Sequence, residues 1–206
     1  MRKPTVCISH ATGAGGEEVG RAVAERLGLR YVDDEVIGEA AEWAELDPRL
    51  VAGVEQRRSF VARLLGHAAE RTAPTRLPPG YAVRTPPTDE DLRGLITDVL
   101  RSFGAQGGVV IVAHAASFAL AGGEVLRVLV TASPGTRAAR VAAERGVGAR
   151  EAERVVKGED AARADYLRRF YGVEREEPVH FDLVVNTDAL EPARAAELVA
   201  AAAAAR

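Results

Sequence analysis

Thr5–Gly20 reads TVCISHATGAGGEEVG. A short apolar run leads into a stretch with four glycines among eight residues, Gly13–Gly20, and apolar residues then follow at helical spacing. This order predicts a β-strand, a tight turn and an α-helix. Backbone N–H groups gather at such a turn, where the helix dipole also favours negative charge. Because four glycines exceed what a tight turn requires, the stretch predicts an anion-binding loop.

Two known phosphate-binding patterns fit this loop only in part. A dinucleotide-binding loop needs a third glycine where this chain has Glu18, although Asp33 or Asp34 stands where a ribose-binding acid belongs. The usual P-loop pattern has a lysine followed by a serine or threonine. This chain has Gly16 at the lysine position and Glu17 at the serine or threonine position. The dinucleotide-binding interpretation therefore stays open beside the P-loop interpretation.

Composition restricts the class of protein. A chain of 206 residues, 47% of them hydrophobic, predicts one α/β domain with a full core. The net charge of −3 offers no broad positive field for nucleic acid or an anionic membrane. The single cysteine, Cys7, excludes an internal disulfide, and its apolar neighbours predict a buried, inert thiol. With no signal peptide or membrane span in the sequence, we expect a cytoplasmic protein.

Apolar runs and helical patterns alternate along the chain, which predicts a three-layer α/β sandwich with a parallel sheet. The expected strands are Thr5–Ser9, Arg30–Val32, Gly108–Ala113, Leu126–Ala132 and Leu183–Asn186. The expected helices are Glu17–Leu27, Asp33–Trp43, Pro48–Leu65, Leu92–Phe103, Pro134–Glu144, Ala149–Phe170 with a break near Gly158, and Pro192–Ala205.

Two segments depart from this alternation. Thr72–Thr88 carries five prolines and predicts a loop or flap inside the domain, because the strand pattern resumes after it. Gly146–Gly172 is dense in charge. It is either a solvated helical face or a basic lid that folds over phosphates.

The fuller pattern resembles the cytidylate kinase-like family, P-loop proteins related to nucleoside monophosphate kinases. The opening of that family is similar to Gly13–Gly20 followed by Leu27–Asp33. Four further similar pieces follow in the order of the family, and together they cover most of the chain: Val109–Ala116, Val128–Val141, Asp160–Gly172 and Phe181–Leu190.

This resemblance implies a single P-loop kinase-like domain over residues 1–206, with an insert at about 40–90 and a lid at about 146–172. Its five-stranded parallel sheet would have the order 2-3-1-4-5. The implied reaction moves the γ-phosphoryl group of ATP to a nucleoside monophosphate or another small acceptor, with ATP and Mg²⁺ as cofactors. No nucleic-acid or membrane partner is expected, and the oligomeric state stays open, a homodimer included.

The resemblance also assigns residues to this reaction, since the planar fork of arginine grips phosphate bidentately. The implied catalytic residues are Arg140, Arg163, Arg168 and His114. The implied cofactor-binding residues are Gly13, Ala14, Gly15, Gly16, Glu17, Glu18 and Arg137, and Asp33 would lie on the acceptor side. No residue is assigned as a direct metal ligand.

Two positions depart from the family pattern. Glu17 stands where the family carries arginine, and at about 4 Å a like charge beside a phosphate costs on the order of 4 kcal/mol. Glu17 could instead point outward or hold Mg²⁺ through water. His114 replaces an arginine at a strand end, where it, like His10, is a phosphate contact, a general base or a satisfied histidine. These departures leave open a second function, a degenerate P-loop protein that binds a nucleotide or anion as a regulatory module.

Overall fold

The computed structural model describes residues 3–33, 89–113 and 115–206. Several sequence predictions lie wholly or almost wholly outside these residues. They are the helices expected at Asp33–Trp43 and Pro48–Leu65, the loop expected at Thr72–Thr88, the insert expected at about 40–90, and the roles of Asp34 and His114.

The chain divides into two compact units by its internal contacts. One unit contains residues 1–33 and 100–206, and the other contains residues 34–99. The glycine-rich loop belongs to the first unit, which is described below by itself.

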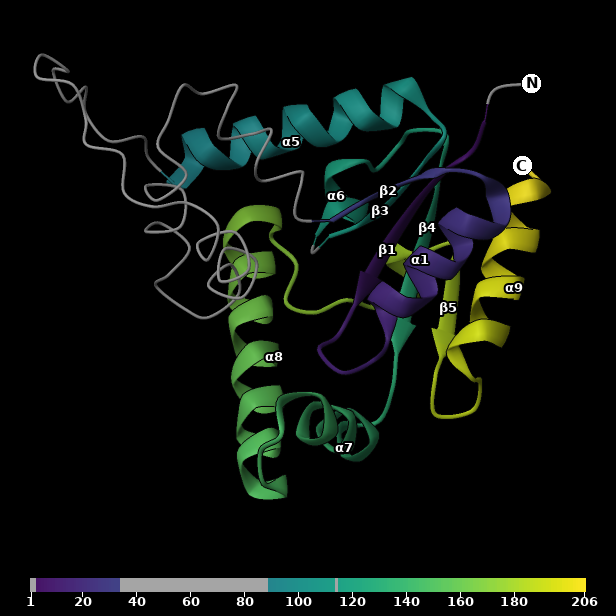
Figure 1. The fold of residues 1–206 in the computed structure, drawn as a ribbon. Coiled ribbons are helices and arrows are strands. Elements are labelled where there is room, and N and C mark those ends of the chain that lie inside the picture. Colours follow the sequence, from purple (N-terminus) through teal and green to yellow (C-terminus); the bar gives the residue numbers. More distant parts are fainter. Residues whose placement is uncertain (1–2, 34–88, 114) are drawn as a thin grey trace, which may run out of the picture. The chain divides into compact units, whose positions relative to one another are not determined.

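The first unit contains a parallel sheet of five strands in the order β2-β3-β1-β4-β5 (Figure 1). The strands are β1 (Thr5–His10), β2 (Arg30–Val32), β3 (Val109–Val112), β4 (Val125–Thr131) and β5 (Leu183–Asn186). Thr5 at the start of β1 pairs with Val109 on one side and with Val125 on the other. β1 is buried along its whole length, which explains its continuous apolar run. The predicted fold class and strand order are confirmed.

Helices connect the strands. They are α1 (Gly16–Leu27), α5 (Asp89–Gln106), α6 (Ala116–Ala119), α7 (Pro134–Arg145), α8 (Ala149–Tyr171), α9 (Pro192–Ala204) and the short 3₁₀ helix η2 (Pro178–His180). The break predicted near Gly158 is wrong, because α8 runs through it without interruption. An interior glycine costs a helix only about 1 kcal/mol, which the packing of α8 against α7 offsets.

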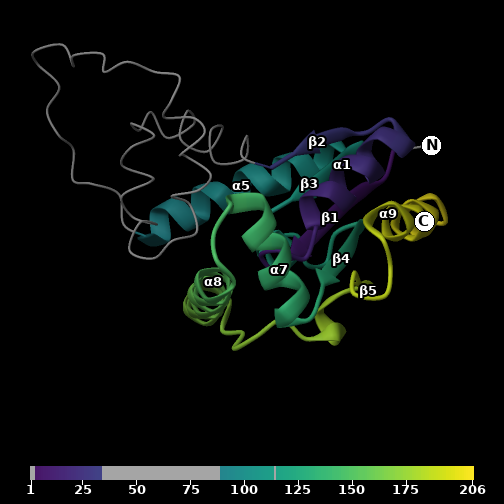
Figure 2. The ribbon, with the colours of Figure 1, turned by 60° about the horizontal axis from the view of Figure 1, so that its bottom comes forward.

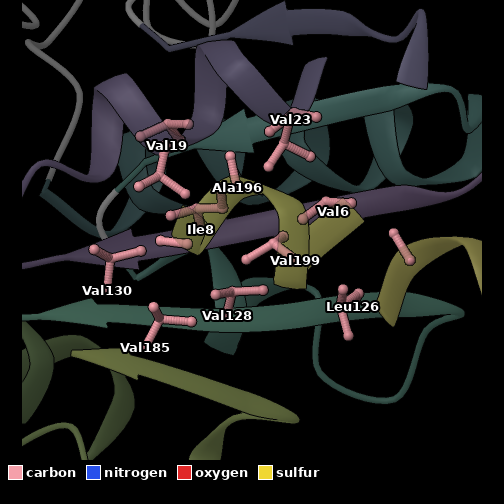
Figure 3. Close-up of a cluster of buried hydrophobic side chains, with 14 of the residues drawn as sticks. Val6, Ile8, Val19, Val23, Leu126, Val128, Val130, Val185, Ala196 and Val199 are labelled. Atoms are coloured by element: carbon pink, nitrogen blue, oxygen red, sulfur yellow. The ribbon is translucent and has the colours of Figure 1, made fainter. Parts of the chain in front are cut away.

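The main core lies between one face of the sheet and the helices α1 and α9 (Figure 3). Val6 and Ile8 of β1 face this side together with Val128 and Val130 of β4. The helices contribute Val19, Val23, Ala196 and Val199. These side chains follow the period of two in the strands and of three to four in the helices, so the sequence pattern fixes which side of each element is buried.

The opposite face of β1 carries Cys7 and Ser9, against α6. The hydroxyl oxygen of Ser117 lies 3.3 Å from that of Ser9 and 3.6 Å from the sulfur of Cys7. Burial raises the pKa of the Cys7 thiol to about 12. The thiol therefore stays protonated at neutral pH, and the predicted burial of the cysteine is confirmed.

The helices α7 and α8 lie at the end of the sheet where β4 and β5 terminate (Figure 1). They pack on each other through Ala138 and Val141 of α7 and Ala152 and Val156 of α8. Figure 2 shows the two helices in a second view. This pairing places α8 next to the carboxyl ends of the strands, where parallel α/β sheets bind ligands.

Within the described part of the chain, no helix combines the length and hydropathy that crossing a bilayer requires.

Candidate phosphate-binding site

The loop between β1 and α1 folds as a backbone nest. Gly13 and Gly15 both adopt left-handed conformations, with φ of 76° and 79°. Gly15 is the N-cap of α1, and its carbonyl accepts the first helical hydrogen bond from the N–H of Val19 at 3.0 Å. No side chain caps this helix end, and the N–H groups of the first turn find no carbonyl within the helix. This geometry is of the kind that binds an anion, and anion binding by the loop stays a prediction.

Close packing requires two of the glycines. A Cβ atom on Gly13 would lie 2.5 Å from the carbonyl oxygen of Arg137. A Cβ atom on Gly16 would overlap the side chain of His10. The loop is thus pressed between α7 and the end of β1, so two of its glycines serve packing as well as donor presentation.

Arg137 of α7 lies beneath the loop with only 6% of its side chain exposed. Its two terminal nitrogens donate to the two carboxylate oxygens of Asp160 at 2.8 and 2.6 Å, and one of them also lies 3.4 Å from the carbonyl oxygen of Thr12. The Nε–H of Arg137 is buried without a hydrogen-bond partner. This guanidinium already makes the bidentate contact that a phosphate would make.

Arg140, one turn further along α7, ties the loop to the carboxyl end of β5. Its guanidinium donates to the carbonyl oxygen of Gly13 at 3.3 Å and to both the hydroxyl and the carbonyl oxygen of Thr187 at 2.9 Å. The Thr187 hydroxyl donates in turn to the carbonyl oxygen of Ala14 at 2.8 Å. The loop is held in shape by a side chain that lies 173 residues away in sequence.

Arg163 of α8 reaches the end of β1. Its Nε–H donates to Glu176 at 2.7 Å, one Nη group donates to the same carboxylate oxygen, and the other donates to the carbonyl oxygen of His10. Both charged side chains are only 9% exposed. The second carboxylate oxygen of Glu176 is buried without a hydrogen-bond partner.

A third contact joins α8 to the loop through Glu159. The hydroxyl of Thr12 donates to one carboxylate oxygen of Glu159, and Arg145 donates to the other at 2.9 Å. The segment interpreted as either a solvated face or a lid thus contains a helix with three polar contacts around the site, one each to Thr12 of the loop, His10 at the end of β1 and Arg137 of α7. The lid interpretation fits these contacts, and the outer face of α8 is solvated as well.

The structure places the other predicted residues less centrally. Asp33, after β2, pairs with Arg21 at 3.2 Å. Arg168 is 60% exposed and pairs with Asp165 at 2.9 Å, away from the contacts made by Arg163. The ring of His10 is buried, with Nδ1 3.3 Å from the carbonyl oxygen of Ala11. The structure therefore brings Arg137, Arg140 and Arg163 to the loop and leaves Arg168 on the surface.

The sequence prediction assigns no role to five residues that make contacts at this site: Thr12, Glu159, Asp160, Glu176 and Thr187. Thr187 lies in the closing segment Phe181–Leu190, so the resemblance marks its neighbourhood but not its contact with the loop. Glu159 and Glu176 lie among many other charged residues in the sequence. The spacing of these residues does not indicate which carboxylates are buried.

The charge at Glu17 is less damaging than the sequence indicates. Its side chain is 50% exposed and lies 3.9 Å from the guanidinium of Arg21.

We expect Glu17→Gln to change the dissociation constant of tripolyphosphate by less than about threefold at 0.15 M salt, because exposed charges are screened. Isothermal titration calorimetry measures this constant. Tightening beyond about tenfold would mean that the carboxylate faces the bound anion.

Comparison with known proteins gives the same family as the sequence resemblance. The model of the cytidylate kinase-like family matches residues 5–189. The bifunctional pantoate ligase/cytidylate kinase of Prochlorococcus marinus (strain MIT 9313) is 29% identical over 165 residues, which cover 68% of this chain and 31% of that protein. This chain thus spans about a third of the length of that relative.

Two solved structures share the fold. An uncharacterized protein from Eubacterium ventriosum ATCC 27560 superposes with a TM-score of 0.69 at 15% identity, over 99% of this chain and 100% of that chain. Shikimate kinase from Acinetobacter baumannii, solved in complex with shikimate, superposes with a TM-score of 0.51 at 14% identity, over 96% and 90%.

The family match covers the loop, α7, α8 and the closing strand, which are the elements that build the site. It supports the class of a P-loop, kinase-like phosphotransferase. With the sheet order, the glycine loop and the match in agreement, the chain belongs to the cytidylate kinase-like family.

Proposed function

We propose that this protein transfers the γ-phosphoryl group of ATP to a nucleoside monophosphate or another small acceptor. The observation that carries the proposal is the arrangement of three arginines around one loop. Arg137, Arg140 and Arg163 each donate to a backbone carbonyl of residues 10–13, where the strand meets the loop. Phosphoryl transfer depends on positive charge around the equatorial oxygens far more than on covalent participation by the protein.

The residues present fit a polyphosphate without the usual lysine. The uncapped first turn of α1 offers N–H groups for the donor phosphates, and the arginines supply the positive charge that Gly16 cannot. Once bound, Mg²⁺ would neutralise phosphate oxygens, and a role for Glu17 in holding its water ligands stays a prediction. In the described part of the chain, no group of three or more His, Cys, Asp and Glu side chains forms a metal site. We therefore assign the ion to the nucleotide rather than to a protein cage.

The choice of acceptor follows the names of the family and of its relative. The family description and the name of the bifunctional relative both refer to cytidylate kinase, so CMP and dCMP are the first acceptors to test. Asp33 follows the last residue of β2, at the edge of the sheet where β1 leads into the loop, and we place it on the acceptor side. The role of His114 as a phosphate contact or general base stays a prediction.

One observation favours a second function, a nucleotide-binding regulatory module without turnover. All three arginines are already bound to oxygen atoms of the protein, and Arg137 and Arg163 are bound to carboxylates. A protein of this kind would bind nucleotide and release no ADP.

A coupled assay for ADP tests the proposal, with Mg-ATP and CMP, dCMP or small hydroxyl compounds as acceptors. We expect acceptor-dependent ADP release, reduced about a hundredfold in Arg140→Ala, because the variant loses both a positive charge at the proposed transfer site and the contacts that brace the loop. Arg194→Ala, which removes an exposed arginine on α9, is the matched control and should keep full activity. A thermal-shift screen with ATP and NAD(H) accompanies the assay. Stabilisation by ATP without ADP release would favour the regulatory module, and stabilisation by NAD(H) alone would favour a dinucleotide-binding protein.

A further inference from the structure

The helix α8 and the segment after it place three carboxylates on the groups that surround the loop. Glu159 accepts from the hydroxyl of Thr12, Asp160 accepts from Arg137, and Glu176 accepts from Arg163. Arginine and hydroxyl donors of this kind also bind phosphate oxygens. The protein therefore fills its own anion-binding groups with anions of its own.

Arg137 shows this competition most directly. Asp160 takes both terminal nitrogens of its guanidinium, and the remaining Nε–H is buried without a partner. A phosphate needs the same fork in the same bidentate manner. The carboxylate and an incoming phosphate therefore exclude each other at Arg137.

Burial indicates which side of the pair can move. The side chain of Arg137 is 6% exposed, whereas that of Asp160 is 42% exposed. The half of α8 that carries Ala152 and Val156 is anchored on α7, while the contacts with the loop lie further along, from Glu159 to Arg163. Asp160 can therefore leave Arg137 while the apolar anchor of the helix stays in place.

We infer that α8 is an autoinhibitory element, in which Asp160 acts as an internal phosphate mimic that an incoming polyphosphate must displace from Arg137. The inference rests on the proposed function, since it concerns the same anion site. The apparent affinity for a ligand falls in proportion to the fraction of molecules in which Asp160 has released the arginine.

Asp160→Asn tests this inference because it removes the charge and keeps the shape of the side chain. We expect the variant to bind tripolyphosphate more tightly than the wild-type chain, on the order of tenfold, which lies within the usual range of coupling between sites. Titration calorimetry at 50 mM salt measures both dissociation constants. Glu153→Gln is the matched control, because it removes one exposed carboxylate from the same helix.

A double-mutant cycle separates local competition from a general gain in positive charge. In the background of Arg137→Met, Asp160→Asn should no longer tighten binding. A gain that persists in this background, or that Glu153→Gln reproduces, would overturn the inference. Glu159→Gln, which weakens the contact with Thr12, provides an independent variant and should also tighten binding.

The outcomes distinguish the two proposals. If the wild-type chain binds tripolyphosphate and Asp160→Asn binds it equally or more weakly, Asp160 positions Arg137 for the ligand and the autoinhibitory role is wrong. If neither the wild-type chain nor any variant binds at millimolar concentration, the anion site itself is wrong. Far-ultraviolet circular dichroism of each variant confirms that it is folded.

Discussion

Replacing Arg163 with methionine should lower the free energy of unfolding by about 3–5 kcal/mol, the usual cost of removing one partner from a buried ion pair. The substitution leaves the carboxylate of Glu176 buried without its cation, and it also removes a donor from the carbonyl oxygen of His10. Urea unfolding followed by circular dichroism measures the loss.

Two further variants sharpen this experiment. Arg168→Met removes an exposed arginine from the same helix and should cost less than about 0.5 kcal/mol. The double variant Arg163→Met with Glu176→Leu should recover most of the lost stability, because no buried charge remains. Equal losses in Arg163→Met and Arg168→Met would contradict the buried pair. The double variant also lacks the guanidinium, so an ADP assay on it separates the structural role of Arg163 from its proposed role in transfer.

Gly13→Ala should destabilise the protein by about 2–4 kcal/mol and weaken tripolyphosphate binding at least about tenfold, since steric strain and overpacking both act at this position. Its φ of 76° is unfavourable for alanine, and the new Cβ atom would lie 2.5 Å from the carbonyl oxygen of Arg137. Either the loop or α7 must move, and both build the anion site. Urea unfolding and titration calorimetry measure the two effects.

Gly28→Ala is the matched control for this substitution. Gly28 ends α1 with a φ of 59°, and an added Cβ atom would meet no atom within 4 Å. It should cost only the left-handed penalty of about 1–2 kcal/mol and leave anion binding unchanged. Equal effects at the two positions would show that the contact with Arg137 is unimportant.

Local sequence signals predict the framework of this protein well. Gly28 ends α1 in the left-handed conformation, and Ser133 with Pro134 begins α7 through a side-chain hydrogen bond to the N–H of Thr136. The apolar runs place all five strands within one residue at each end. These signals depend on residues close in sequence, so they can be recognised without knowledge of the tertiary structure. The predicted helix break at Gly158 is wrong because packing of the helix outweighs the low helix propensity of glycine.

The partners of the charged side chains could not be predicted in this way. Arg163 lies four residues from Glu159 and three from Asp160, yet it pairs with Glu176, thirteen residues further along. Asp160 instead reaches Arg137 on the neighbouring helix. Helical spacing offers each arginine several carboxylate partners, and the ion pairs would contribute similar, small stabilising energies. Which pair forms depends on how α7 and α8 pack. The sequence therefore predicts that arginines gather at the loop but not that carboxylates already occupy them.

The bond from Thr187 to the carbonyl oxygen of Ala14 has a consequence for how the site is assembled during synthesis. A ribosome releases Gly13–Gly20 early, but the side chain that braces this stretch emerges about 170 residues later. A nascent or truncated chain that stops before β5 carries every glycine of the nest and lacks its brace and the hydroxyl partner of Arg140. The observed shape of the loop therefore depends on contacts from the carboxyl end of β5, and a chain that stops before β5 lacks them.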